Sequence, residues 1–168
     1  MLEQIVTALS AVPPWLATII LATLPVGELR GALPVALVVY ELPLWLAVFL
    51  SVLGNIIPVY FLLLFFEHVS TWIEHNWEFG NRILQKLYDR TRRKLEGSVE
   101  KYGPWALILF VGIPLPVTGA WTGTLAAFVF GLSKQKAFIS IFLGLLISAT
   151  IVTFLTLGTT FTIGSLTG

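Results

Sequence analysis

The fold is decided by an interrupted apolar stretch near the N-terminus, Leu24-Pro25-Val26-Gly27-Glu28-Leu29-Arg30-Gly31-Ala32-Leu33-Pro34. It places a carboxylate, a guanidinium, two glycines and two prolines between two uncharged apolar flanks, 15–24 and 35–40. Proline and glycine disfavour helix, so we expect the helix to break here. A flank of roughly 10 residues makes about 15 Å of helix, half of a ~30 Å hydrocarbon core. The stretch therefore predicts a re-entrant hairpin over 14–40, whose short helices enter and leave the membrane on one side.

This hairpin would place two ionisable side chains, Glu28 and Arg30, inside the membrane. Charged groups are costly there and usually mark a site. The alternative is a surface turn between two short spans, with both charges in water. We take Glu28, Arg30, Pro25 and Gly31 as the candidate site residues of this first break.

The composition indicates an all-α integral membrane protein. Of the 168 residues, 57 % are hydrophobic and only 11 % are charged, whereas soluble domains carry about 25 % charged residues. The chain contains no cysteine, which excludes disulfides, thiol catalysis and thiolate metal sites. The N-terminus lacks the basic flank of a signal peptide, so we expect none. A short helix at 2–9, with apolar residues at helical spacing, is predicted to lie on the membrane surface.

The run 42–66 carries no charge and is long enough to span the bilayer. Pro58 interrupts its backbone hydrogen bonding, and Asn55 needs a polar partner in hydrocarbon. Two interpretations stay open: a kinked helix that packs on its neighbours, or an Asn55 side chain that faces a polar cavity.

The segment 67–102 is predicted to be amphipathic and to lie on the membrane surface. Its apolar residues recur at helical spacing, and it holds seven of the ten basic residues: Arg82, Lys86, Arg90, Arg92, Arg93, Lys94 and Lys101. Basic residues beside a span favour anionic lipid headgroups over nucleic acid. His68 and His75 lack metal-ligand spacing, so we expect no metal and no cofactor.

A second broken stretch follows within 103–131, from Gly112 to Gly123. Its arms are again too short to cross a bilayer, which predicts a second re-entrant hairpin. The second full span is 137–157, whose serines and threonines suit helix packing or the lining of a polar path. The candidate site residues in this break are Pro114, Pro116, Thr118, Gly119 and Trp121.

The two halves of the chain resemble each other when residue n is placed beside residue n + 90. Pro14-Trp15 then meets Pro104-Trp105, and the two breaks superimpose, with Glu28 beside Thr118. This register predicts an internal repeat. Repeat 1 would cover 12–66 and repeat 2 would cover 103–158, within one membrane domain.

The distribution of basic residues predicts the orientation of the two repeats. The segment 82–101, Lys134 and Lys136 should be cytoplasmic, and the N-terminus should lie outside. The halves would then have opposite topology, and inverted repeats with broken helices are typical of transporters. The two halves would also have opposite topology if each hairpin were two complete spans, so the charges alone do not distinguish the two cases.

Three motifs resemble those of the small multidrug export proteins: Pro-x-x-Glu at Pro25, Gly-Asn-x-x-Pro at Gly54, and Pro-x-Pro-x-Thr-Gly-Ala-Trp-x-Gly at Pro114. The resemblance covers essentially the whole chain and implies the cytoplasmic membrane of a prokaryote. More distantly, the layout resembles the DedA superfamily, which implies facing re-entrant hairpins and the movement of polyprenyl-phosphate carriers or phospholipids. The DedA pattern has arginines around its second-hairpin proline, whereas the positions near Pro114 are apolar or small and Arg30 is the one intramembrane cation.

These observations predict a transporter of an amphiphilic or lipid-like substrate. Arg30 would attract an anionic headgroup and Glu28 would exchange protons, and a homodimer would bury the breaks away from lipid. The alternatives are a membrane scaffold, in which the two charges only hold the hairpin in shape, and a small-drug exporter, as the family name suggests. An enzyme is disfavoured because the membrane segments contain no histidine or cysteine.

Overall fold

The computed structural model describes residues 2–9, 11–83, 85–86, 98–115 and 118–167. These residues form helices and connecting turns, with no strand among them. Two helices are long and apolar enough to cross a membrane, α4 (Leu44–Asn76) and α8 (Lys134–Thr167). The structure therefore agrees with the prediction of a helical membrane protein.

Shorter helices precede each long helix. After α1 (Leu2–Ala8), the elements α2 (Pro14–Thr23), α3 (Glu28–Pro34) and the π-helical η1 (Val35–Val39) lead into α4. In the second half, α6 (Ser98–Gly112) and α7 (Ala120–Val129) lead into α8. Residues 24–27 interrupt the first pair, and the described residues 113–115 and 118–119 interrupt the second, as the proline and glycine content predicts.

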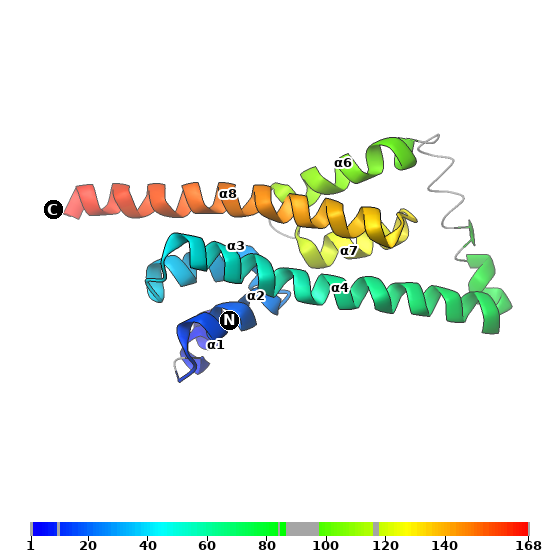
Figure 1. The fold of residues 1–168 in the computed structure, drawn as a ribbon, viewed down its shortest axis with the longest axis horizontal. Coiled ribbons are helices and arrows are strands. Elements are labelled where there is room, and N and C mark those ends of the chain that lie inside the picture. The colour runs from blue at the N-terminus through cyan, green and yellow to red at the C-terminus, as the bar shows by residue number, and fades with distance from the viewer. Residues whose placement is uncertain (1, 10, 84, 87–97, 116–117, 168) are drawn as a thin grey trace.

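The two long helices lie side by side and run in opposite directions (Figure 1). The first pair, α2 and α3, contacts α4, while α6 packs on α8. In Figure 1 the two pairs approach one another near the middle of the molecule. The fold thus brings two unwound segments, far apart in sequence, to the same place.

Large apolar side chains cover much of the outer surface of the long helices. Phe154 and Phe161 on α8 are 74 % and 81 % exposed, and Phe61 on α4 is 64 % exposed. A protein in water would not leave such a surface uncovered. These side chains have the positions expected of residues that face lipid.

Several boundaries differ from those expected. Helix α4 continues ten residues beyond Phe66 because no proline or glycine stops it before Asn76. Helix resumes at Glu28 instead of after Pro34. Pro34 has no N–H to donate within the helix, and the π-helical turn η1 begins at the next residue. Helix α6 begins at Ser98 and contains Pro104. Of the predicted basic segment, 87–97 lies outside the described residues, so its amphipathic character stays a prediction.

Two glycines allow the long helices to approach the shorter ones closely. A Cβ at Gly54 of α4 would lie 2.6 Å from the Ile19 carbonyl oxygen of α2. A Cβ at Gly144 of α8 would lie 2.9 Å from the Ile108 carbonyl oxygen of α6. Both distances are far below van der Waals contact and involve backbone, so these helix pairs require glycine at the crossing.

We expect Gly54→Ala to destabilise the protein by about 1–3 kcal/mol because the added methyl forces α2 and α4 apart. Thermal unfolding of the purified protein in detergent measures this change. Gly158→Ala is the matched control, because a Cβ at Gly158 meets nothing within 4 Å. An equal melting temperature for both variants would contradict the close packing at Gly54.

Candidate functional site

The carboxylate of Glu28 joins the first break to the helix that follows the second. Its Oε1 accepts a hydrogen bond from the backbone N–H of Trp121, at 3.3 Å. Trp121 belongs to the first turn of α7, where the N–H groups have no partner within the helix. Glu28 therefore caps a helix that lies about ninety residues further along the chain.

The backbone of Glu28 has an unusual conformation. Its φ is 43°, in the left-handed region that non-glycine residues rarely adopt. Such a conformation costs on the order of 1–3 kcal/mol and persists only where the surrounding structure enforces it. The residue is also only 8 % exposed. The fold thus holds the buried Glu28 in a strained backbone conformation, with its carboxylate against the N-terminus of α7.

Arg30 forms the second connection between the breaks. Its Nη2 lies 3.2 Å from Glu28 Oε2, and its Nη1 donates to the backbone carbonyl of Leu115. The Arg30 side chain is 24 % exposed and that of Glu28 is 11 % exposed. These bonds use two of the five N–H donors of the guanidinium. Arg30 therefore bridges both breaks, and its other N–H donors have no protein acceptor among the described residues.

Trp121 and Thr118 order the surrounding backbone. The Trp121 Nε1–H donates to the carbonyl of Thr23, at 3.2 Å, and so binds the last residue of α2 to α7. The Thr118 hydroxyl lies 2.8 Å from the Leu115 carbonyl oxygen and stabilises the turn of the second break. Trp121 of the second half thus fixes the backbone at the start of the first break, and Thr118 fixes the backbone of the second break, to which it belongs.

Gly119 leaves the space that the ion pair occupies. The residue is buried at the N-terminus of α7, and a Cβ on it would overlap the Glu28 carboxylate and the Arg30 guanidinium. The sequence singled out Gly119 as part of a break motif. The structure adds that a side chain at this position and the cross-break ion pair exclude each other.

A family model of small multi-drug export proteins matches residues 28–151, which is well over half of the chain. The chain belongs to this family. The family's description, an export protein, indicates transport over enzymatic activity. The match begins at Glu28 and includes every contact residue of α7.

No curated protein and no solved structure matches this small multi-drug export protein. The comparisons therefore show no relationship to the DedA superfamily, and that resemblance stays a prediction. The assignment of the family rests on the chain from the first break to the middle of α8.

A groove of about 290 Å³ adjoins the ion pair of this export protein. Arg30, Pro34 and Pro114 line one side of it, and Leu155 and Thr159 of α8 belong to the other side. Arg30 thus borders an open space between the breaks and the second long helix. The α8 residues of this groove lie beyond the segment that the family model matches.

The remaining predicted site residues have different positions. Pro25 is exposed in the first break, and Gly31 is partly buried within α3. Pro116 lies outside the described residues. Asn55 is fully buried on α4, where its Nδ2 donates to the Ser51 carbonyl at 3.3 Å and its Oδ1 has no partner among the described residues. No hydrogen bond in the described part of the chain joins Asn55 to the ion pair.

Sequence reasoning missed the Leu115 carbonyl and Thr23 as partners. It expected the serines and threonines of the second span to suit helix packing or a polar path, and Thr156 of that span does line the groove, but it did not place α8 beside Arg30. A backbone carbonyl carries no signal in a sequence, and the contacts that involve Leu115 and Thr23 join residues 85 and 98 positions apart. Glu28 and Arg30 had a local signal as rare charges in an apolar stretch. Thr118, Gly119 and Trp121 had one as members of the Pro-x-Pro-x-Thr-Gly-Ala-Trp motif.

Proposed function

We propose that this protein is a membrane transporter whose substrate site lies where the two breaks meet. One observation supports this most directly: Glu28 and Arg30, from one break, bond to Trp121 and Leu115 beside the other. Discontinuous helices with ionisable groups at their junction are typical of substrate and ion sites in transporters. A junction of this kind allows the binding of a charged group to alter the packing of both halves.

The proposed architecture is an inverted repeat of two re-entrant hairpins, 14–40 and 103–131, each followed by a full span. The opposite directions of α4 and α8 support it (Figure 1). So do Gly54 and Gly144, which are 90 positions apart and make equivalent close approaches to α2 and α6. The ten-residue helices α2 and α7 are each about 15 Å long, too short to cross a bilayer alone.

The proposed substrate is an amphiphile with an anionic headgroup, such as a polyprenyl-phosphate-like lipid. The guanidinium of Arg30 keeps donors for an anion and borders the groove beside α8. The exposed Leu155 at this groove would contact an apolar tail. Glu28 is the proposed proton-exchanging group, because it is the carboxylate bonded to Arg30. A small hydrophobic drug is the alternative substrate that the family name favours.

The proposed location is the cytoplasmic membrane of a prokaryote, with 82–101, Lys134 and Lys136 on the cytoplasmic side and the N-terminus outside. The positive-inside rule supports this orientation. A homodimer is proposed because a second copy would cover the breaks from lipid.

A second candidate function, a membrane scaffold, is favoured by the same hydrogen bonds. The carboxylate of Glu28 caps α7 and pairs with Arg30, and buried ion pairs of this kind can be purely structural. In that case the pair would serve only to hold the two halves together.

The double variant Glu28→Met/Arg30→Met separates these two functions. Methionine fills a similar volume without charge, and removing both partners leaves no unpaired ion. We expect the variant to stay folded in detergent but to lose transport of a fluorescent anionic lipid analogue in reconstituted vesicles. The matched control, Glu78→Gln/Arg82→Gln, removes an exposed ion pair with an N–O distance of 3.5 Å and should transport normally. Wild-type transport by the methionine pair would favour the scaffold.

A further inference from the structure

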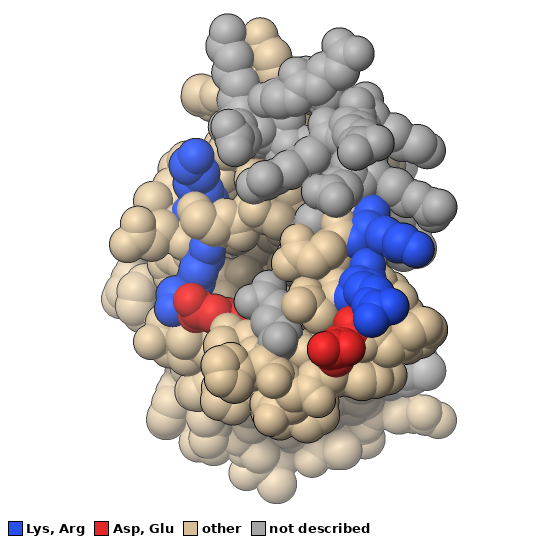
Figure 2. Space-filling model, turned by 90° about the vertical axis from the view of Figure 1, so that its right-hand side faces the viewer, with Lys and Arg blue, Asp and Glu red and all other residues tan. Residues whose placement is uncertain are grey.

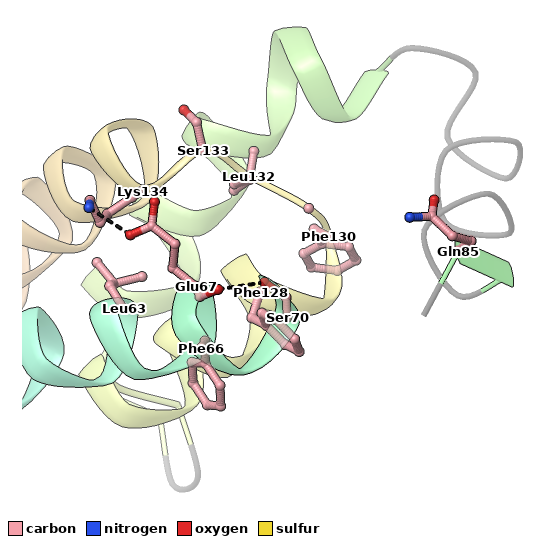
Figure 3. A pocket seen from close by; sticks show the side chains of 11 residues that line it. Leu63, Phe66, Glu67, Ser70, Gln85, Phe128, Phe130, Leu132, Ser133 and Lys134 are labelled. Atoms are coloured by element: carbon pink, nitrogen blue, oxygen red, sulfur yellow. Dashed lines mark hydrogen bonds and ion pairs between the residues drawn. The ribbon is translucent and has the colours of Figure 1, made fainter. Parts of the chain in front are cut away.

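A second cavity lies at the far end of the long helices from the C-terminus. It has a volume of about 360 Å³ and is formed by α4, the turn between α7 and α8, and the segment that carries Gln85 (Figure 3). Glu67 and Lys134 lie at its edge, and Gln85 lies on the opposite side (Figure 3). Ligand pockets are commonly about 300–1,000 Å³, so the space is sufficient for a small molecule or a lipid headgroup.

The cavity contains one positive and one negative charge. Lys134 Nζ lies 2.7 Å from Glu67 Oε2, and the two side chains are 40 % and 55 % exposed. An ion pair this exposed contributes little to stability, because water competes for both groups. Each group is therefore able to exchange its partner for an oppositely charged group of a ligand.

The floor of the cavity is apolar. The rings of Phe66 and Phe128 stack with their centroids 4.8 Å apart, and Leu63 and Leu132 also line the space. A ligand with a charged head and an apolar body would match both parts of the lining. A fully hydrophilic ligand would leave the aromatic floor in contact with water.

The charges of the cavity lie at the depth expected of lipid headgroups. The uncharged run of α4 ends at Glu67, and the uncharged run of α8 begins after Lys136. The end of the molecule in Figure 2 carries basic side chains on both sides of a central hollow. The cavity is therefore at the boundary between the apolar and the charged parts of the protein.

We infer that this cavity binds one phospholipid whose headgroup carries both a phosphate and an ammonium group. Lys134 binds the phosphate, Glu67 binds the ammonium, and the glycerol and upper acyl chains rest on Phe66 and Phe128. A zwitterionic headgroup leaves both protein charges paired, whereas a purely anionic one brings a negative charge against Glu67. This site is separate from the proposed substrate site at Glu28 and Arg30.

Native mass spectrometry of the full-length protein in detergent tests the inference. The protein is titrated with phosphatidylethanolamine and, separately, with phosphatidylglycerol of the same acyl chains. We expect phosphatidylethanolamine to bind about tenfold more tightly, because its ammonium pairs with Glu67 and phosphatidylglycerol has no such group. Glu67→Gln should remove this preference, because Glu67 is the group that distinguishes an ammonium from an uncharged headgroup. Lys134→Gln should weaken the binding of both lipids, because both carry the phosphate. The charge exchange Glu67→Lys/Lys134→Glu should restore part of the preference that Glu67→Gln loses.

The control variant Glu41→Gln, which removes an exposed carboxylate in the turn before α4 and away from the cavity lining, should keep the full preference. Free phosphoethanolamine at the same concentration should not displace the lipid, because it leaves the aromatic floor uncovered. Equal or stronger binding of phosphatidylglycerol, an unchanged preference in Glu67→Gln, unchanged affinities in Lys134→Gln, or displacement by phosphoethanolamine would each overturn the assignment. Circular dichroism of every variant establishes that the loss of binding is not a loss of fold.

Discussion

Glu28→Gln is expected to abolish transport while the protein remains folded. Glutamine keeps the length of the side chain and an oxygen that accepts from the Trp121 N–H. It cannot release a proton or neutralise Arg30, so a cycle that depends on the carboxylate stops. Arg30 keeps its bond to the Leu115 carbonyl and is 24 % exposed, which limits the loss of stability to about 1–3 kcal/mol. Flux of a fluorescent amphiphile into reconstituted vesicles, with an imposed proton gradient, should fall to that of protein-free vesicles.

Glu41→Gln provides a control matched in chemistry and in backbone conformation. Glu41 also has a positive φ, of 50°, but it is exposed in the turn before α4. This variant should transport as the wild type does. Normal flux in Glu28→Gln would remove the carboxylate from the transport mechanism and leave it a capping role at α7.

Gly119→Ala should strongly destabilise the protein. The new Cβ would lie 2.6 Å from Glu28 Cδ and would also overlap the Arg30 guanidinium. Glu28 cannot move aside freely, because its left-handed backbone and its bond to Trp121 fix it. Overpacking combined with the loss of charged hydrogen bonds should cost about 2–5 kcal/mol. Chemical denaturation in detergent measures this free energy of unfolding.

A double-mutant cycle tests the cause of that loss. In a Glu28→Ala background the carboxylate is absent, so the added methyl of Gly119→Ala has space and should cost much less. Gly158→Ala, in an open part of α8, should be neutral or slightly stabilising through helix propensity. Equal costs of Gly119→Ala with and without the Glu28 side chain would show that the ion pair does not occupy this space.

The sequence predicted the features that depend on local chemistry. Uncharged runs of sufficient length predicted the two long helices, and proline and glycine predicted the interruptions before each of them. The rarity of charge in apolar surroundings singled out Glu28 and Arg30. Phe66, where the predicted span ends, is not the end of α4, because the first charge marks the edge of the apolar region while a helix continues until something breaks it.

The tertiary structure alone decided which groups meet. In the repeat register Glu28 stands beside Thr118, yet its carboxylate bonds to the N–H of Trp121. The sequence also gave no sign of the Leu115 carbonyl as the acceptor for Arg30, of the space at Gly119, or of the Glu67–Lys134 pair. The free energy of transferring a side chain into the membrane and its helix propensity are properties of single residues, so both can be read from a short stretch of sequence. The pairing of distant backbone and side-chain groups depends on how the helices pack, which no local pattern encodes.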